Sequence, residues 1–231
     1  VKIIDLSQDH RIAADHSFVY GLPELNKEAI QNANYVANPG CFATAIQLAI
    51  LPLAEAGLLT GEVYASCTTG STGAGQSLAE TSHFSWRENN LSVYKAFTHQ
   101  HLAEINQSLM QVQKNDLGNL HILPQRGSFT RGILACITLK SDHSLEQLIA
   151  LFEEKYKEEP FVFLSPKNCH LKQVVNTNKC LLHIEKNEED VMIVSVIDNL
   201  LKGASGQAVQ NMNLMFGLPE TTGLKLKPSA F

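Results

Sequence analysis

The first half of the chain places short apolar runs around one long amphipathic segment. Residues 41–56 carry apolar side chains at helical spacing and are followed by Gly57, a residue type that often ends a helix. Pro52 lies inside this segment and is expected to disturb its last turn. The surrounding pattern predicts strands over residues 1–6, 34–37 and 62–69 and a short helix over residues 23–31.

The second half is rich in strands and has few helices between them. Helices are predicted over residues 101–113, from the capping box that starts at Ser144, and over residues 206–216. Strands are predicted over residues 120–123, 132–139, 161–164, 171–175, 180–185 and 191–197, the last two as a hairpin. Residues 9–20 and 83–97 have no pattern that we can assign. Such a strand-rich half favours an α+β domain with a largely antiparallel sheet.

Composition narrows the class of protein. The 231 residues are 44% hydrophobic and 18% charged, as in an ordinary soluble globular protein. The formal charge of −5 gives no sign of nucleic-acid binding, and no apolar run approaches the roughly 20 residues of a membrane span. Five cysteines lie far apart without a CxxC pair, so neither a zinc site nor a disulfide framework is predicted. A cytoplasmic location is expected.

One cysteine stands at a turn, in "ANPGCFATA" (Ala37–Ala45), where the predicted long helix begins. At a helix start, free backbone N–H groups and the helix dipole favour thiolate over thiol, so we expect a lowered pKa for Cys41. The same N–H groups can bind the oxyanion that forms when sulfur attacks a carbonyl. Cys41 is therefore a candidate nucleophile, and a small buried apolar residue is the alternative.

A nucleophilic cysteine needs a base, and "FTHQHLAEI" (Phe97–Ile105) offers His99 and His101. Two residues apart in an extended segment, the imidazoles share a face, which would also suit a metal ion. No further ligand stands at a recognisable spacing, so we predict no metal site. A purely structural role for either histidine stays open.

Two further segments are candidates for binding anions. "GSTGAG" (Gly70–Gly75) can bring backbone N–H groups close to phosphate, although it is no Walker loop, and a surface loop is the alternative. "RGSFTRGIL" carries Arg126 and Arg131 near the start of a strand, and a guanidinium binds carboxylate or phosphate in bidentate fashion. For each arginine the alternative is solvation or an ion pair within the protein.

These segments together resemble the N-acetyl-gamma-glutamyl-phosphate reductase family of arginine biosynthesis. The ordered set is more specific than any motif alone, and it spans essentially the whole chain. The matching motifs are "IIDLSQDHR" (Ile3–Arg11), "NPGC" with Thr44, "STGAG" (Ser71–Gly75), "HQHLAEI" (His99–Ile105), "RGIL" (Arg131–Leu134) and the block Asp198–Asn213. The family usually has Arg where this chain has Gln76, and Pro where it has Ala103.

The resemblance implies a mechanism with NADP(H) as the cofactor. Cys41 would attack the acyl phosphate of an N-acylated glutamyl phosphate, expel phosphate and form a thioester, which hydride from NADPH would reduce to the semialdehyde. His99 matches the general acid–base residue of the family. The resemblance places substrate binding on Asn38, His101, Arg126 and Arg131, and cofactor binding on Ser71, Gly73, Ala74, Gly75 and Asn199.

The resemblance also implies the architecture, α/β plus α+β, like semialdehyde dehydrogenases and glyceraldehyde-phosphate dehydrogenase. Residues 1–40 would be the C-terminal remnant of a dinucleotide-binding Rossmann domain. Residues 41–202 would form a mixed, largely antiparallel catalytic and oligomerisation domain, and residues 203–231 a helix and tail that return to the first part. The chain would be N-terminally truncated, because the family begins with a glycine-rich dinucleotide loop. A homodimer or homotetramer is expected.

Other interpretations remain at this point. A cysteine hydrolase or acyltransferase would use the same thiol and imidazole without hydride transfer, and a catalytically inert fragment would use neither. Aspartate-semialdehyde dehydrogenase shares the chemistry, but "HQH" and the block Asp198–Asn213 favour the glutamyl enzyme. The N-acyl group of the substrate stays open between acetyl and a larger group such as succinyl.

Overall fold

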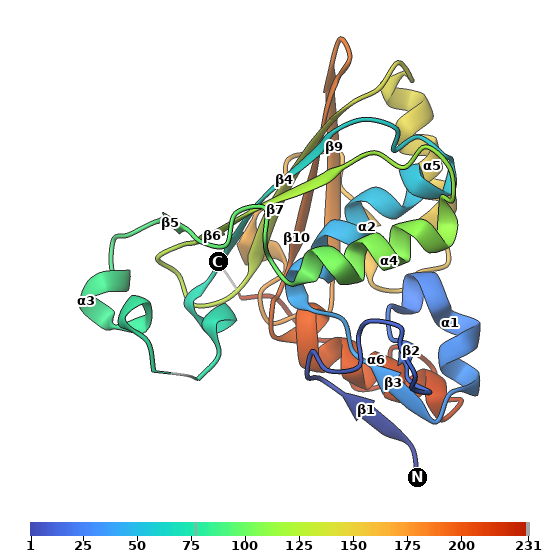
Figure 1. The fold of residues 1–231 in the computed structure, drawn as a ribbon, viewed down its shortest axis with the longest axis vertical. Helices are drawn as coiled ribbons and strands as arrows, with labels where there is room; N and C mark the ends of the chain where they lie inside the picture. Colours follow the sequence, from blue (N-terminus) through green and yellow to red (C-terminus); the bar gives the residue numbers. More distant parts are fainter. Residues whose placement is uncertain (77, 230–231) are drawn as a thin grey trace.

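The computed structural model describes residues 1–76 and 78–229. The chain forms a seven-stranded sheet with helices against it and, at one end, a small three-stranded sheet (Figure 1). A thin segment that includes α3 (Phe84–Arg87) projects beyond the edge of the large sheet. None of the helices in the described part of the chain is long and apolar enough to cross a membrane.

The large sheet is mixed and mostly antiparallel, as predicted. In the order β5–β6–β4–β7–β10–β9–β8, only the pairs β4–β6 and β8–β9 are parallel among the strands described. The strands are β4 (Val63–Thr69), β5 (Ser92–Val93), β6 (Leu120–Arg126), β7 (Ile133–Lys140), β8 (Val162–Leu164), β9 (Cys180–Asn187) and β10 (Asp190–Ile197).

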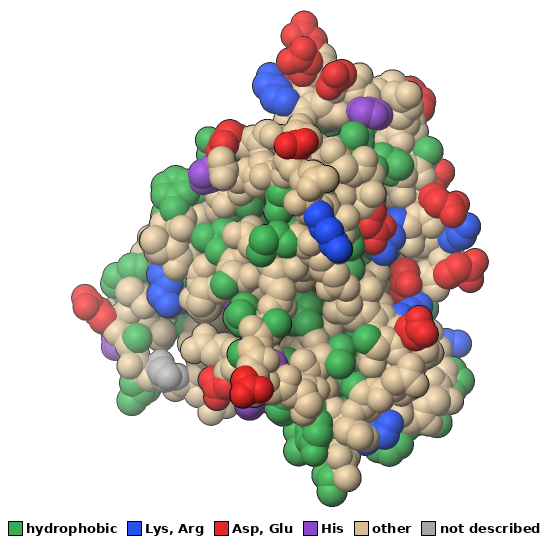
Figure 2. Space-filling model, turned by 45° about the vertical axis from the view of Figure 1, so that its right-hand side comes forward, with side chains coloured by type: hydrophobic (Ala, Val, Ile, Leu, Met, Phe, Trp, Pro, Cys, Tyr) green, Lys and Arg blue, Asp and Glu red, His purple; other side chains and the backbone are tan. Residues whose placement is uncertain are grey.

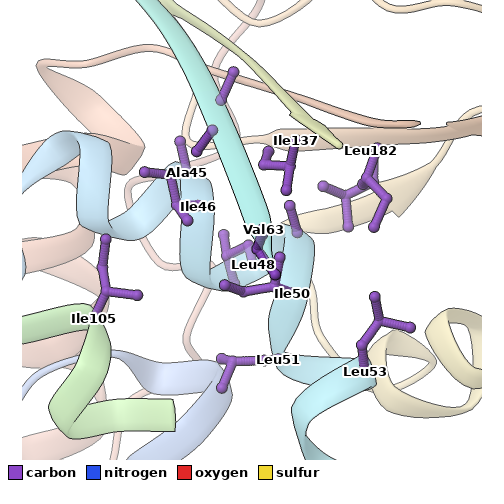
Figure 3. Packing of buried hydrophobic residues seen from close by; sticks show 14 of the residues in the cluster. Ala45, Ile46, Leu48, Ile50, Leu51, Leu53, Val63, Ile105, Ile137 and Leu182 are labelled. Carbon is purple, nitrogen blue, oxygen red and sulfur yellow. The ribbon is translucent and has the colours of Figure 1, made fainter. Parts of the chain in front are cut away.

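Helix α2 (Cys41–Glu55) is buried along nearly its whole length. It lies between the sheet and the two helices α4 (His101–Val112) and α5 (Leu145–Tyr156), so apolar side chains on all its sides are covered (Figure 3). Burial on every side explains why the segment is so rich in Ala, Ile and Leu. Cys41 is the first residue of α2 and therefore lies at one end of this core, and the burial of the residues that follow it holds the first turn of the helix in place.

Pro52 does not break α2, contrary to the disturbance expected from the sequence. A proline has no N–H to donate to the carbonyl four residues earlier, here that of Leu48. The hydroxyl of Tyr156, on α5, donates to this carbonyl oxygen at 2.6 Å. A side chain from another helix thus replaces the missing backbone hydrogen bond, and α2 continues to Glu55. Gly57, at φ of 73°, follows its end as predicted.

The small sheet joins the N-terminal part of the chain to its C-terminal helix. Its parallel strands have the order β1–β3–β2, and α1 packs against α6 beside them. Ile30, Val36 and Leu214 form the centre of a separate apolar cluster between these elements. The elements are β1 (Ile3–Asp5), β2 (Val19–Tyr20), α1 (Pro23–Asn32), β3 (Tyr35–Ala37) and α6 (Gly206–Met215), which a π-helical turn, η4 (Leu201–Ser205), precedes.

Two local predictions from the sequence are confirmed in detail. The hairpin of β9 and β10 pairs in continuous register from its turn to Cys180 and Ile197. The capping box at the start of α5 is complete, since Ser144 Oγ accepts from the N–H of Gln147 at 3.2 Å and Gln147 Oε1 accepts from the N–H of Ser144 at 2.8 Å. Both features depend on residues close together in sequence, which is why pattern alone predicts them.

The strand predicted over residues 171–175 is wrong. This segment forms a short 3₁₀ helix, η3 (Leu171–Gln173). Val174 packs against Val194 and Val196 on the face of the large sheet that is opposite α2, which we call the second face. The apolar residues that suggested a strand therefore reflect burial against a sheet. Burial alone does not distinguish a strand from a covering loop, because both need apolar side chains on one side.

A buried ion pair connects α1 to η4. Lys202 Nζ lies 2.6 Å from Glu24 Oε1 and donates to Gln210 Oε1 at 2.9 Å, and neither charged side chain is exposed. Lys202→Met should lower the free energy of unfolding by about 3–5 kcal/mol, because it leaves a buried carboxylate unpaired. Urea unfolding measures this loss. The double variant that adds Glu24→Leu should regain much of it, and an equal loss in both variants would contradict the explanation.

Charged side chains are dispersed over the face shown in Figure 2. Acidic side chains gather at the top of this view, and Glu188, Glu189 and Asp190 at the turn of the β9–β10 hairpin are exposed. Lysines and arginines lie singly on this face.

Candidate active site

Three residues, Asn38–Gly40, turn the chain from the end of β3 into α2, which begins at Cys41. Cys41 lines a cavity of about 360 Å³, which we call the Cys41 cavity. Its lining comes from stretches within residues 6–11, 40–42, 69–75, 94–101 and 199–204. A larger cavity, of about 630 Å³, lies between α5 and β9 and contains none of the predicted site residues.

The pKa expected for Cys41 is corrected by the structure. Burial raises the pKa of its thiol to about 11, and the backbone N–H of Phe42 and the Arg11 guanidinium offset only part of this effect. The side chain remains partly exposed to the cavity, but protein surrounds it on its other sides. The helix start does favour the thiolate, as predicted, yet desolvation outweighs it. The free protein therefore holds Cys41 as a neutral thiol near pH 7.

Alkylation of Cys41 by iodoacetamide tests this pKa. Because the thiolate is the reactive form, the rate should rise about tenfold per pH unit from neutral pH and level off only near pH 11. Mass spectrometry of the labelled peptide measures the rate, with the fully buried Cys67 as a slow internal control. A rate that is already constant below pH 8 would show instead that the helix start lowers the pKa of Cys41 by more than burial raises it.

His99 and His101 both line the Cys41 cavity. Burial lowers the pKa of His99 to about 4 and that of His101 well below its usual value, so both imidazoles are neutral at pH 7. The backbone N–H of His101 donates to His99 Nδ1 at 3.2 Å. A neutral ring that accepts at Nδ1 carries its proton on Nε2, so His99 has a proton that it can donate.

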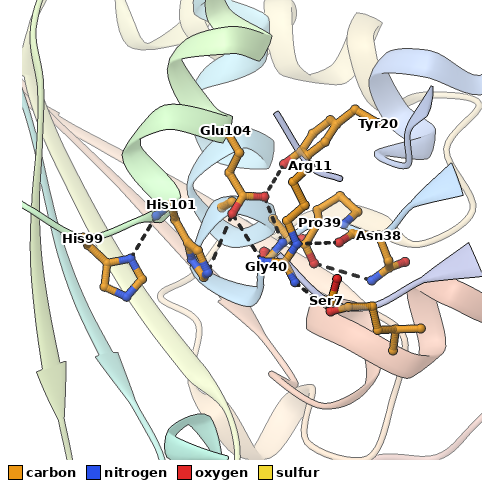
Figure 4. Close-up of polar contacts among 12 residues, drawn as sticks. Ser7, Arg11, Tyr20, Asn38, Pro39, Gly40, His99, His101 and Glu104 are labelled. Carbon is orange, nitrogen blue, oxygen red and sulfur yellow. Dashed lines mark hydrogen bonds and ion pairs between the residues drawn. The ribbon is translucent and has the colours of Figure 1, made fainter. Parts of the chain in front are cut away.

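Glu104 is the centre of a polar network beside the cavity (Figure 4). It is almost completely buried, and its Oε2 accepts from the N–H of Gly40 at 3.0 Å and from the Tyr20 hydroxyl at 2.9 Å. Its Oε1 lies 3.7 Å from His101 Nε2. Burial raises the pKa of Glu104, an effect that Arg11 and the N–H of Gly40 partly offset. The carboxylate thus ties the turn before Cys41 to the helix that carries His101.

Arg11 is the guanidinium that lines the Cys41 cavity. Its Nε donates to the Asn38 carbonyl at 2.9 Å, its Nη2 to the Leu6 carbonyl at 3.0 Å, and its Nη1 to Glu104 Oε1 at 3.5 Å (Figure 4). A guanidinium has five N–H donors, so two remain for an anion in the cavity.

Gly40 lets the Arg11 and His101 side chains meet over the backbone of the turn. A Cβ added at Gly40 would overlap His101 Nε2 and lie 2.7 Å from Arg11 Nη1. The two nitrogen atoms therefore converge at one point, one residue before Cys41.

Neither Arg11 nor Glu104 was predicted from the sequence as a site residue. Glu104 could have been found, because it follows His101 by three residues on a predicted helix and so shares its face. Arg11 had no such signal, since 93 residues separate it from Glu104.

Most of the other predicted site residues lie at or near the Cys41 cavity. Gly73, Gly75 and Asn199 line it, whereas Asn38 is buried beneath the turn, with its Nδ2 donating to the Ala204 carbonyl at 3.1 Å. Ser71 and Ala74 belong to the same 3₁₀ turn, η1 (Ser71–Ala74), but are not part of the cavity lining. The loop and the cysteine therefore line the same cavity.

Arg126 and Arg131 do not line the Cys41 cavity. Arg131 Nη2 lies 2.9 Å from Oδ2 of the fully buried Asp198, so its charge is paired within the protein. Arg126 lies over the ring of Tyr94, with its guanidinium carbon 4.5 Å from the ring centroid, and Tyr94 separates it from the cavity. Of the arginines described, Arg11 is the one at the cavity wall.

The π-helical turn η4 packs directly on the nucleophile. A Cβ added at Gly203 would lie 2.8 Å from Cys41 Cβ and 3.2 Å from its Cα. Only a residue without a side chain leaves room for Cys41 at this contact. π-helical turns often occur at functional sites, and here the turn forms one wall of the cavity.

Comparisons with known proteins place this site in a family. Residues 41–199 match the family described as "Semialdehyde dehydrogenase, dimerisation domain". N-acetyl-gamma-glutamyl-phosphate reductase of Flavobacterium johnsoniae is 60% identical over 235 residues, which cover 100% of this chain and 72% of the relative. The protein of the same name from Bacteroides thetaiotaomicron is 59% identical over 232 residues, with the same coverage.

Solved structures show the same fold at low sequence identity. Aspartate semialdehyde dehydrogenase II from Vibrio cholerae aligns with a TM-score of 0.72 at 16% identity, over 94% of this chain and 73% of that one. A probable aspartate-semialdehyde dehydrogenase from Pseudomonas aeruginosa aligns with a TM-score of 0.69 at 14% identity, over 93% and 72%. This chain therefore has the semialdehyde dehydrogenase fold and belongs to the N-acetyl-gamma-glutamyl-phosphate reductase family of oxidoreductases.

Proposed function

We propose that the protein reduces an N-acyl-gamma-glutamyl phosphate to the corresponding semialdehyde, with release of phosphate, in arginine biosynthesis. The observation that carries the proposal is the placement of Cys41, His99 and Arg11 on one cavity at the start of α2. A thiol, a protonated imidazole nitrogen and a free guanidinium edge are the groups that thioester chemistry on an acyl phosphate requires.

In the first step, Cys41 Sγ bonds to the γ-carbonyl carbon and the bond from that carbon to the phosphate oxygen breaks. The thiol proton leaves with phosphate, and a thioester remains on Cys41. The N–H groups at the start of α2 stabilise the negative charge that develops on the carbonyl oxygen. Arg11 binds the phosphate through its two free N–H donors, with His101 Nε2 beside it.

The family resemblance supports NADP(H) as the cofactor, and the cavity has a wall that fits a nicotinamide. Gly73 and Gly75 form this wall, and a Cβ added at Gly75 would meet no atom within 4 Å. A flat ring can therefore approach the backbone there, beside Asn199, which also lines the cavity. Ser71 and Ala74 would act on it only through the turn η1, because neither of them lines the cavity. The nicotinamide supplies the hydride that reduces the thioester.

His99 is the acid–base residue of the reduction. Its Nε2–H donates a hydrogen bond to the former carbonyl oxygen and stabilises the negative charge that develops there as the thioester is reduced. When the carbon–oxygen double bond forms again, the carbon–sulfur bond breaks and the aldehyde departs. The sulfur takes up one proton from water, relayed through His99. The low pKa of His99 suits this relay, because a protonated His99 gives its proton readily to the leaving sulfur.

Asn38, Arg126 and Arg131 have supporting roles in this proposal. Asn38 holds the turn through the Ala204 carbonyl, and Asn211 Nδ2 donates to Asn38 Oδ1 at 3.1 Å. Arg131 orients Asp198, whose Oδ1 accepts from the N–H groups of Leu200 and Leu201 at the start of η4. Arg131 thus acts on the substrate through η4. Arg126 acts on it through Tyr94, since Arg126 packs on the Tyr94 ring and Tyr94 lines the Cys41 cavity.

We also propose that the protein is a cytoplasmic homodimer or homotetramer. The match to a dimerisation domain supports assembly. The second face of the large sheet carries partly exposed apolar side chains, among them Leu134, Cys136 and Met192, which a second copy would cover. The five cysteines are free thiols, as a reducing compartment would keep them.

The proposed function is tested by following nicotinamide absorbance at 340 nm. In the reverse direction, N-acetylglutamate semialdehyde and phosphate should reduce NADP⁺, and omission of phosphate should stop the reaction. The same assay with NAD⁺ tests the cofactor preference. Hydrolysis of an acyl phosphate without any change in nicotinamide absorbance would favour the hydrolase alternative, and neither activity would favour an inert fragment.

A further inference from the structure

The four arginines of the chain divide into two pairs. Arg11 and Arg131 each lie within 4.0 Å of a buried carboxylate, that of Glu104 and of Asp198. Arg87 and Arg126 have no such partner anywhere in residues 1–76 and 78–229. Buried charges in proteins are normally paired, so the unpaired guanidinium of the buried Arg87 needs an explanation.

Arg87, at the end of α3, is buried to nine-tenths although it lies in the thin projecting segment. Its Nη2 donates to the Gly127 carbonyl at 2.7 Å, whereas its Nε and Nη1 are buried without a hydrogen-bond partner. Burial and the neighbouring charge of Arg126 lower its pKa. A buried N–H without an acceptor lowers the stability of the protein, so the position favours a ligand that accepts hydrogen bonds.

Arg126 is the second member of this cluster. It precedes Gly127, whose carbonyl accepts from Arg87, and its charge is near enough to lower the pKa of Arg87. Arg126 Nη1 reaches only the Thr81 hydroxyl, at 3.4 Å, and its Nε is buried without a partner. Two neighbouring cations without a carboxylate partner in the described part of the chain favour the binding of an anion.

A cavity of about 310 Å³ opens at Arg87, and we call it the Arg87 cavity. Ser71, Ser82, Ser128 and Thr130 line it, and each has a hydroxyl group that can donate to an anion. Glu88 also lines the cavity, but it is exposed and makes no ion pair with Arg87 or Arg126, so it belongs to the solvent side.

The Arg87 cavity and the Cys41 cavity share a wall, the turn η1. Ser71 faces the first cavity, and the next residue, Thr72, lines the second. Thr72 Oγ1 donates to the Thr130 carbonyl at 2.6 Å and accepts from Asn199 Nδ2 at 3.0 Å, which fixes the wall from both sides. A ligand in the Arg87 cavity would therefore act on the turn that faces Cys41.

We propose that Arg87 forms an anion-binding site, which takes a carboxylate or phosphate group of a small ligand in the Arg87 cavity, beside the Cys41 cavity. The anion accepts hydrogen bonds from the Arg87 guanidinium and from hydroxyl groups of the lining. Arg126 is not part of the lining and strengthens the binding through its neighbouring charge. Two sources supply such a group: a free anion such as phosphate, or a carboxylate at the far end of the substrate's N-acyl group. The second source rests on the proposed function.

Isothermal titration of the protein with inorganic phosphate and with succinate tests the site. The variants are Arg87→Met and Arg126→Met, which keep the apolar stems, and Lys140→Met serves as a control that removes one exposed charge elsewhere. The unaltered protein and the control should bind at least one anion at least tenfold more tightly than either arginine variant. Equal affinity in all four proteins would overturn the proposal. So would the absence of binding by the unaltered protein at about 10 mM anion, a concentration that detects dissociation constants in the millimolar range. If Arg87→Met does not fold, Arg126→Met decides, because its side chain is partly exposed.

Steady-state kinetics then separate the two sources. If the anion belongs to the substrate, KM should be about tenfold lower for the N-succinyl than for the N-acetyl semialdehyde, and Arg126→Met should remove this difference. If the anion is free, both substrates should have the same KM, and added succinate should change both equally in the unaltered protein but not in the variant. Turnover of either substrate keeps the proposed function even where the arginine variants show that the anion site is absent.

Discussion

Replacing Cys41 by serine is expected to lower kcat/KM for the reductase reaction by about a thousandfold or more. A hydroxyl is a far weaker nucleophile than a thiol at neutral pH, and the buried site that already raises the Cys41 pKa to about 11 would disfavour an alkoxide further. The 340 nm assay in the reverse direction, with phosphate and semialdehyde in excess, measures the loss.

Cys136→Ser is the matched control for this experiment. Cys136 is a partly exposed free cysteine on β7, and it points toward the second face of the sheet, away from the Cys41 cavity. Its replacement should leave kcat/KM within about twofold, as for most surface changes away from a site. Turnover by Cys41→Ser within tenfold of the unaltered protein would remove Cys41 from the mechanism.

Gly203→Ala is expected to lower kcat/KM by about a hundredfold, because a displacement of about 1 Å at a reacting atom has effects of this size. The added Cβ would lie 2.8 Å from Cys41 Cβ, closer than side-chain carbons approach, and Ile197 Cδ1 at 3.3 Å blocks movement to the other side. The nucleophile or η4 must therefore shift.

Gly61→Ala makes the same chemical change where a Cβ would meet no atom within 4 Å. It should leave activity and unfolding unchanged within error. The iodoacetamide profile of Cys41 gives a second measurement for Gly203→Ala, since a displaced thiol should change its rate at a fixed pH. Full activity of Gly203→Ala would show that the packing of η4 on Cys41 tolerates a methyl group.

Some of the site was predictable because its elements are local. The strand, the turn "NPG" and the helix that begins at Cys41 follow from residues within about 15 positions, and so does the capping box at Ser144. The family resemblance added the roles of residues that no local pattern could assign. Their assignment as catalytic or binding residues stays a prediction until the variants are measured.

The errors arose where burial or distant partners decide the outcome. The pKa of Cys41 was expected to fall, but burial raises it, and Gly203 of η4, which packs on Cys41, is remote from it in sequence. Pro52 was expected to disturb α2, but the hydroxyl of Tyr156 replaces its missing hydrogen bond. The segment predicted as a strand over residues 171–175 is a short 3₁₀ helix that covers the sheet. An apolar run indicates that residues are buried, but it does not indicate whether they form a strand or a turn.

The sequence by itself determined that a cysteine stands at the start of a buried helix and that two imidazoles and a glycine-rich loop accompany it. Backbone sterics and short-range hydrogen bonds act within a few residues, so local sequence patterns predict these features. Only the tertiary structure decided that Arg11 rather than Arg131 reaches the cavity, and that Glu104 joins Gly40 to His101. Partners 93 residues apart meet only when the two sheets assemble, and charge and solvation are settled there.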